Sequence, residues 1–254
     1  MAPAPVVLLG EHHADFAHLQ MEGETLRRAQ ALGYDTLAVE YPCDLEPAVH
    51  AYLASPRDAA AYRAFLEARL DTELAGLGED APEVSPAQRQ EWIEELRTEP
   101  QAVLTKQLWD RAAELGYAVR CIDLPVAALN RLPEVETKAD LALRNQFMAD
   151  YLAEITEDQG RQVILVAGSA HLISEEECPS LQEELDRHEV PHRSFALAVD
   201  GRSPAREMRV PEERLAASVD RIAFGAPEIE AFLRATRSGA GAVQSKEPGR
   251  EPRI

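Results

Sequence analysis

The sequence predicts an α/β protein in which a central, mostly parallel β-sheet is flanked by helices. Short continuous apolar runs, the pattern of strands covered on both faces, occur at 5–10 and 162–168. Longer segments with helical spacing of apolar residues separate such runs, as in βαβ units. The 254 residues, 45% of them hydrophobic, suffice for a substantial core. We therefore expect one domain over 1–236 and a disordered, Gly-, Ser-, Lys- and Pro-rich tail over 237–254.

The first predicted unit is a strand, a helix and a second strand within about forty residues. The strand covers 5–10, and the helix runs from about Asp15, which can cap it, to Leu32. Gly33 can end this helix, because glycine readily adopts the left-handed conformation found there. The second strand covers 35–40. Such a crossover is almost always right-handed, so the two strands are expected to be parallel.

Residues 46–115 are predicted to form several helices, which is too long for a simple crossover. The helical pattern breaks near Gly76 and Gly78 and again at Pro100. We interpret this stretch as a helical insertion that caps the carboxyl-terminal edge of the strands, and its last part as the helix that returns to the sheet.

The rest of the chain continues the alternation. The predicted strands are 117–123, 162–168 and 192–199, and the predicted helices are 135–157, 175–188 and 211–235.

Several predicted strands end in ionisable residues. Two of them finish in Gly-x-x-His, which places His13 and His171 just beyond the first and fourth strands, while Glu11, Glu40 and Asp123 stand at strand ends. In an open parallel sheet, ligands bind beyond the carboxyl ends of the strands. The alternative is that polar residues follow strands simply because strands end at the surface. Taken together, these positions favour a shared site.

The helix expected around Arg144 gives a separate indication. Arg144 falls within an apolar stripe, and a guanidinium facing the core needs a carboxylate or a ligand oxygen to offset its desolvation. Asn145 follows it and could add a neutral donor. The alternatives are a structural ion pair and an arginine that extends to the surface. His18, one helical turn beyond His13, is either a semi-buried hydrogen-bonded histidine or a ligand for a metal or haem.

Four motifs, in order, resemble those of the ChaN-like haem-uptake proteins, which share a superfamily with the erythromycin esterases and the TraB/Tiki proteins. The motifs are Gly10-Glu-His-His-Ala-Asp15 with His18 and Gln20, Ala38-Val-Glu40, Leu143-Arg-Asn-Gln-Phe-Met-Ala149, and Val166-Ala-Gly-Ser-Ala-His-Leu172. Two departures stand out: Ala14 intervenes before Asp15, where the ChaN-like motif usually has Asp directly after the His, and no lipoprotein signal is present.

The resemblance implies a parallel-sheet α/β fold with a helical insertion and one pocket. The catalytic residues that it implies are Glu11, His13, Glu40, Arg144 and His171. We add His18, Asp123 and Asn145 as candidate substrate-binding residues.

The expected function is that of a hydrolase-like acid–base enzyme. Its substrate would be a polar small molecule or a peptide-derived ester, lactone or amide, attacked by water that Glu and His activate. No Gly-x-Ser-x-Gly nucleophile elbow surrounds Ser169, so covalent serine catalysis is disfavoured. The alternative function is haem (iron-porphyrin) binding of the ChaN type, with His18 as the candidate exposed ligand.

The sequence leaves the cofactor and the partners of the protein partly open. Either no cofactor is needed or a divalent metal ion is held by Glu11, His13, Glu40 and His171. The formal charge of −19 makes nucleic acid an unsuitable partner. No apolar run is long enough for a membrane span, and no signal peptide is recognisable, so we expect a cytoplasmic protein of undetermined oligomeric state.

Overall fold

The protein is described by a computed structural model covering residues 4–12, 15–78, 81–133, 137–157, 159–198, 205 and 210–237. His13 and the predicted tail from residue 238 onward lie outside these described residues.

Six parallel strands form one sheet in the order β3-β2-β4-β1-β5-β6. The strands are β1 (Val6–Glu11), β2 (Thr36–Pro42), β3 (Ala118–Asp123), β4 (Val163–Gly168), β5 (His192–Leu197) and β6 (Arg221–Ala223). The parallel α/β fold predicted from the sequence is therefore confirmed.

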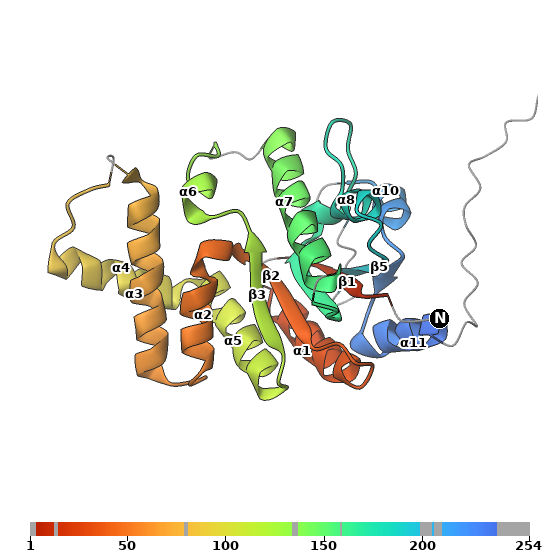
Figure 1. Ribbon diagram of the computed structural model, residues 1–254, viewed down its shortest axis with the longest axis horizontal. Helices are drawn as coiled ribbons and strands as arrows, with labels where there is room; N and C mark the ends of the chain where they lie inside the picture. The colour runs from red at the N-terminus through yellow and green to blue at the C-terminus, as the bar shows by residue number, and fades with distance from the viewer. Residues whose placement is uncertain are drawn as a thin grey trace, which may run out of the picture.

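Helices cover both faces of this sheet (Figure 1). The α-helices are α1 (Phe16–Gln30), α2 (Glu46–Leu53), α3 (Ala59–Gly76), α4 (Pro86–Thr98), α5 (Pro100–Glu114), α6 (Val126–Leu129), α7 (Lys138–Glu157), α8 (Leu181–Arg187), α10 (Glu212–Ser218) and α11 (Ala226–Arg237). Two 3-10 helices are η1 (Cys43–Leu45) and η3 (Ser169–Leu172).

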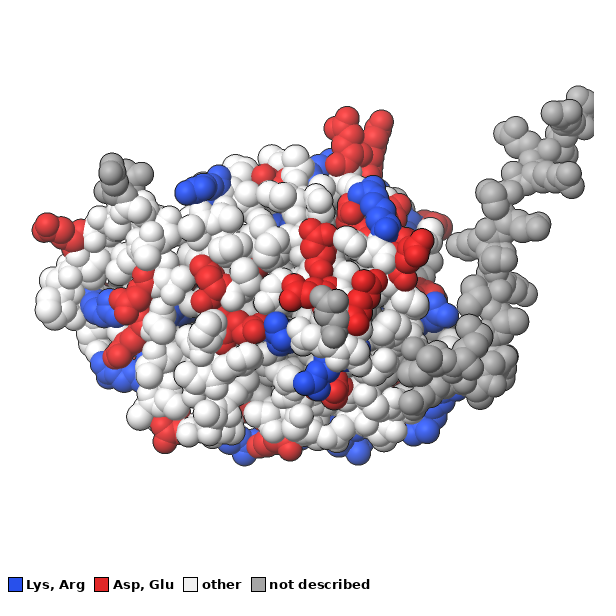
Figure 2. Space-filling view, in the orientation of Figure 1, with Lys and Arg blue, Asp and Glu red and all other residues white. Residues whose placement is uncertain are grey.

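Two cores form because alternate residues of each strand point to opposite faces of the sheet. In β1, Val7 and Leu9 pack with α1, α5 and α11, whereas Val6 and Leu8 pack with α7, α8 and α10. No described helix is long and apolar enough to cross a bilayer. Figure 2 shows acidic side chains outnumbering basic ones on the face it presents, as the formal charge of −19 predicts.

The start of the chain follows its local signals closely. The Asp15 carboxylate caps α1 by accepting a hydrogen bond of 2.7 Å from the backbone N–H of Ala17. Gly33, just after the helix, has a φ of 89°, in the left-handed region that favours glycine. The sequence signals for both ends of this helix are therefore confirmed.

The predicted helical insertion is present as α2 to α5. Helices α2 and α5 pack on β3, and α3 packs on α2, α4, α6 and η1. In Figure 1, α3 and α4 lie to one side of the sheet, beyond its edge strand β3. The insertion also reaches the carboxyl end of β2, where Tyr41 and Pro42 join residues of α3 and α4 around a pocket.

Two predicted helices differ from the structure. The helix expected over 175–188 is α8 alone, because Glu177 has a φ of 67° and Glu175 bridges to Cys178 in a tight turn. Ser180 then caps α8 through a capping box with Glu183.

The region 211–235, expected to be helical throughout, contains β6 between α10 and α11. This strand is anchored by Asp220, whose Oδ2 accepts a hydrogen bond of 2.8 Å from the backbone N–H of Ser194. The sheet therefore has six strands rather than the five predicted.

Candidate functional site

Glu40 lies at the centre of a hydrogen-bonded cluster at the carboxyl edge of the sheet. The pairing of β2 with β3 shifts register between Val39 and Pro42, so Glu40 lies in an irregular part of the strand, near its carboxyl end. The Glu40 Oε1 atom accepts a hydrogen bond of 2.5 Å from Arg144 Nη2, and its Oε2 atom accepts one of 2.7 Å from the backbone N–H of Gly168. These donors favour the ionised carboxylate.

Arg144 joins Glu40 to Asp123. Its Nη2 and Nε atoms bind the two Asp123 carboxylate oxygens at 2.6 and 3.1 Å, in the two-pronged geometry suited to a guanidinium. Asp123 ends β3, and its Oδ1 also accepts from the backbone N–H of Leu124 at 2.8 Å. The exposed fractions of the Arg144, Glu40 and Asp123 side chains are 14%, 10% and 4%. The arginine predicted to face the core thus has two carboxylate partners.

His171 reaches the same carboxylate from η3, the turn that follows β4. Its Nε2 atom lies 3.2 Å from Glu40 Oε1, and its side chain is 3% exposed. On the other side of the ring, Nδ1 lies 2.5 Å from Oδ1 of Asn145. The imidazole therefore links an amide on α7 to the carboxylate at the end of β2.

Asn145 fixes the protonation of that ring. Its Nδ2 donates a hydrogen bond of 2.8 Å to the carbonyl oxygen of Pro179, so Oδ1 is the atom that faces His171. An amide oxygen only accepts, so His171 Nδ1 carries a hydrogen, and Nε2 is the nitrogen left for proton exchange at Glu40. Asn145, which the sequence suggested as a neutral donor, is fully buried; its amide nitrogen donates to the Pro179 carbonyl and its amide oxygen orients His171.

Replacing Asn145 by Leu tests this arrangement. We expect the change to lower the free energy of unfolding by about 1–3 kcal/mol, because the Pro179 carbonyl and His171 Nδ1–H lose their partner in a buried place. Urea unfolding measures the loss, and ¹⁵N NMR of the histidines should show His171 losing its fixed Nδ1–H form. Gln146→Leu, at an exposed position on the same helix, is the matched control and should change stability little. Equal stability of the Asn145 variant and the unaltered protein would contradict the assignment.

Glycine at position 10 leaves room for the side chains of the His171 turn beside β1. A Cβ at Gly10 would lie 2.4 Å from Leu172 Cδ1 and 3.2 Å from Ser169 Oγ. The Ser169 hydroxyl also donates a hydrogen bond of 3.0 Å to the Glu11 carbonyl oxygen. The backbone at Glu11 is therefore held directly against η3.

The Glu11 side chain belongs to a second acidic group, on the α1 side of the sheet. Glu22 of α1 is 1% exposed, and its carboxyl group hydrogen-bonds with that of Glu11. Burial raises the pKa of Glu22 well above its ordinary value, and the negative charges of Glu11 and Asp15 raise it further. Two carboxyl groups in contact share a proton, because both cannot be ionised cheaply.

This carboxyl pair borders a small hollow of about 30 Å³ between β1, α1 and α5. Leu19, Gln101, Leu104, Thr105 and Leu108 complete its walls together with Asp15, Glu11 and Glu22. Glu22 is not among the site residues predicted from the sequence. Its position four residues after His18, on the face of α1 that also carries Met21 and Thr25, was the available signal.

His18 is more deeply buried than the sequence suggested. It is 1% exposed, and its Nδ1 atom accepts a hydrogen bond of 2.8 Å from the backbone N–H of His12. It does not present the exposed imidazole that the haem hypothesis requires.

The predicted site residues thus fall into two groups at one edge of the sheet. Glu40, Asp123, Arg144, Asn145 and His171 form one bonded network. Glu11 joins Glu22 instead, and His13 lies outside the described residues. Within the part of the chain that the structure describes, no group of three or more His, Cys, Asp or Glu side chains is arranged to hold a metal ion.

A scan against protein-family models gives no match, and no curated protein matches the sequence. Several solved structures match over most of the chain. The type III effector HopBA1 has a TM-score of 0.49 and 14% identity, covering 78% of this chain and 79% of its own. ChaN of Campylobacter jejuni, described with cofacial haem binding, has a TM-score of 0.46 and 10% identity, covering 80% and 84%.

A mutant of the erythromycin esterase EreC also matches, with a TM-score of 0.45 and 14% identity, covering 77% of this chain and 70% of its own. ChaN and an erythromycin esterase, two of the three groups named from the sequence motifs, are thus among the similar structures. At these identities the likeness concerns the fold alone, so the chemistry of this protein has to be argued from its own residues.

Proposed function

We propose that the Glu40 network is the acid–base centre of a hydrolase that cleaves an ester, lactone or amide bond in a polar small molecule or a peptide-derived substrate. One observation carries the proposal: His171 has one ring nitrogen held by Asn145 and the other against Glu40. An imidazole oriented on one side and paired with a carboxylate on the other is suited to proton transfer.

The chemistry follows from the charges in the network. A water molecule at the partly exposed edge of Glu40 can lose a proton to the Glu40–His171 pair as it attacks a carbonyl carbon. The Arg144 guanidinium, the most exposed member of its ion-pair group, is suited to stabilise the negative charge that develops on the substrate oxygen. Return of the proton through His171 Nε2 to the leaving group completes the cycle.

The sequence predicted His13 as a general base oriented by Glu40 or Glu11, and this role stays a prediction because His13 lies outside the described residues.

The test is hydrolysis of a panel of p-nitrophenyl esters, γ- and δ-lactones and aryl amides, followed by absorbance and by pH-stat. We expect Glu40→Gln and His171→Gln to lower the rate on the accepted substrate by about 100-fold or more. His188→Gln is the matched control, because His188 pairs with Asp150 on the outer side of α7 and takes no part in the network. Far-UV circular dichroism checks that each variant is folded.

Two results would contradict the proposal. One is the absence of any hydrolysis by the unaltered protein across the panel, and the other is full activity in both network variants. The same assay with and without a chelator separates metal-free hydrolysis by the Glu40 network from the metal-dependent alternative, in which chelation removes activity.

A further inference from the structure

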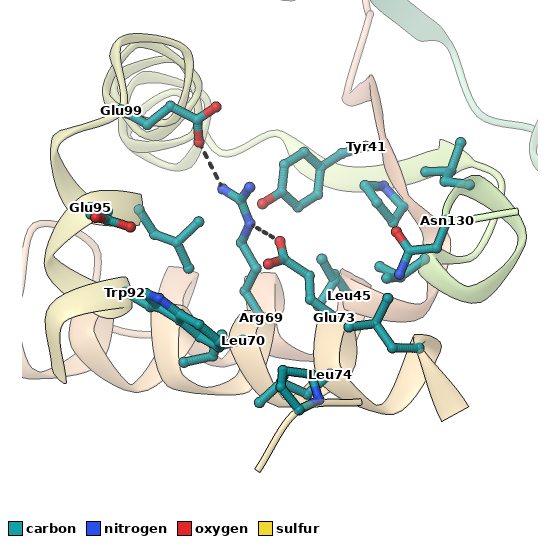
Figure 3. Close-up of a pocket in the computed structure, with 16 residues that line it drawn as sticks. Tyr41, Leu45, Arg69, Leu70, Glu73, Leu74, Trp92, Glu95, Glu99 and Asn130 are labelled. Carbon is teal, nitrogen blue, oxygen red and sulfur yellow. Dashed lines mark hydrogen bonds and ion pairs between the residues drawn. The ribbon is translucent and has the colours of Figure 1, made fainter. Parts of the chain in front are cut away.

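A large pocket lies between the insertion and the sheet, outside the Glu40 network. Its volume is about 750 Å³, within the range of small-molecule sites in proteins. Helices α3 and α4 form two of its walls, and the carboxyl end of β2 and helix α6 form the others (Figure 3). One of its lining residues is Tyr41, which follows Glu40 in the chain.

Most of the pocket wall is apolar. The larger contributors are Leu70, Leu74, Leu77, Trp92, Leu96 and Val126. Leu77, which directly follows α3 and also lines the pocket, is 42% exposed, whereas leucine side chains are usually buried. These side chains favour a ligand with an apolar body.

The charged residues of the pocket are one guanidinium and three carboxylates. Arg69 binds Glu73 at 2.7 Å and Glu99 at 3.5 Å, as the dashed lines in Figure 3 mark. Its positive charge is therefore already offset by two acids. Among the described residues, no cation pairs with the third acid, Glu95. The pocket thus has an excess of negative charge.

Tyr41 adds a hydroxyl group to the same space. Its ring packs edge-on against Trp109 with centroids 5.1 Å apart, while its hydroxyl points into the pocket toward Arg69 in Figure 3. No described residue forms a hydrogen bond with this hydroxyl. A half-buried phenol that hydrogen-bonds to no described residue is suited to bind a polar group of a ligand.

We propose that this pocket binds a small molecule with an apolar body and a protonated amine. The leucines and Trp92 would enclose the apolar body, and the ammonium group would lie near Glu95, with the Tyr41 hydroxyl as an additional acceptor. The inference concerns binding alone and does not depend on the proposed hydrolysis.

Three probes of one shape test the charge preference: 4-phenylbutylamine, 4-phenylbutan-1-ol and 4-phenylbutanoate, which are cationic, neutral and anionic at neutral pH. Isothermal titration calorimetry on the full-length protein measures each affinity, and quenching of tryptophan fluorescence follows binding near Trp92. We expect the amine to bind about tenfold more tightly than the alcohol, and the acid more weakly than either.

Two variants place the binding in this pocket. Glu95→Gln should weaken the amine several-fold and leave the alcohol unchanged, and Leu74→Trp should remove binding of both by filling the space. Glu154→Gln, at an exposed position on α7, removes the same charge elsewhere and should leave amine binding intact. This control matters because the net charge of −19 attracts any cation weakly.

The proposal is overturned if the amine does not bind at millimolar concentration, or if the acid binds as tightly. It is equally overturned if the amine affinity is the same in the Leu74 variant, or falls as much in the Glu154 variant as in the Glu95 variant. Loss of hydrolysis with retained amine binding would reject the proposed reaction and leave this site standing.

Discussion

Replacing Arg144 by Met is expected to lower the free energy of unfolding by about 3–5 kcal/mol, the usual cost of leaving buried charges without their partner. Glu40 and Asp123 both depend on this guanidinium, and their side chains are only 10% and 4% exposed. Urea unfolding followed by circular dichroism measures the loss. Arg144→Lys should recover only part of it, because an ammonium cannot bind two carboxylates in the forked geometry.

Arg161→Met is the matched control for that experiment. Arg161 pairs with Asp35 at 2.8 Å, but both side chains are nearly half exposed. Ion pairs of this kind contribute about 0–1 kcal/mol, so the control should barely change stability. An Arg144 variant that loses no more than the Arg161 variant would show that the network carries little energy. If Arg144→Met does not fold, the Lys variant still allows the comparison.

Replacing Glu22 by Gln is expected to stabilise the protein at neutral pH. Burial, and then the neighbouring Glu11 charge, raise the pKa of Glu22 above its ordinary value of 4.5 in the folded state. As pH rises above about 4.5, the unfolded chain releases this proton first, so the folded state loses stability up to its raised pKa. Each unit of the shift costs about 1.4 kcal/mol, which glutamine avoids because it does not ionise.

The melting temperatures of both proteins are measured from about pH 4 to about pH 9. This range starts near the ordinary glutamate pKa and extends well above it. The unaltered protein should lose stability relative to Glu22→Gln as pH rises. Glu24→Gln on the same helix is a control of opposite sign, because hydrogen bonding to Arg27 lowers the pKa of Glu24 to about 2. The Glu24 carboxylate therefore stabilises the folded state at neutral pH, and this stabilisation is lost in acid, when the carboxylate is protonated. A Glu22 variant that is less stable than the unaltered protein at high pH would contradict the shared-proton assignment.

The sequence predicted those elements whose signals are local. Continuous apolar runs marked β1 and β4, and Asp15 with Gly33 marked both ends of α1. The requirement that a guanidinium among apolar residues needs a carboxylate or a ligand oxygen left Glu11, Glu40 and Asp123 as candidate partners of Arg144, and the structure joins Glu40 and Asp123 to it.

What the sequence did not reveal depends on tertiary packing. The strand β6 has only three residues, and its pairing with β5 rather than its composition makes it a strand. Glu22 is unremarkable in a helix until α5 covers it and Glu11 lies beside it. The large pocket depends on how α3 and α4 pack against the end of β2, which no periodicity specifies.

The place of the insertion in the sheet has an evolutionary consequence. The insertion, α2 to α5, follows β2 and precedes β3 in the chain. These two strands pair directly with each other from Thr36 opposite Ala118 onward. The pairing of β2 with β3 therefore does not pass through the outer helices of the insertion. Helices α3 and α4 line the proposed ligand pocket, whereas Glu40, Asp123 and Arg144 are held by β2, β3 and α7. The proposed ligand pocket and the proposed catalytic network can thus change at different rates in evolution.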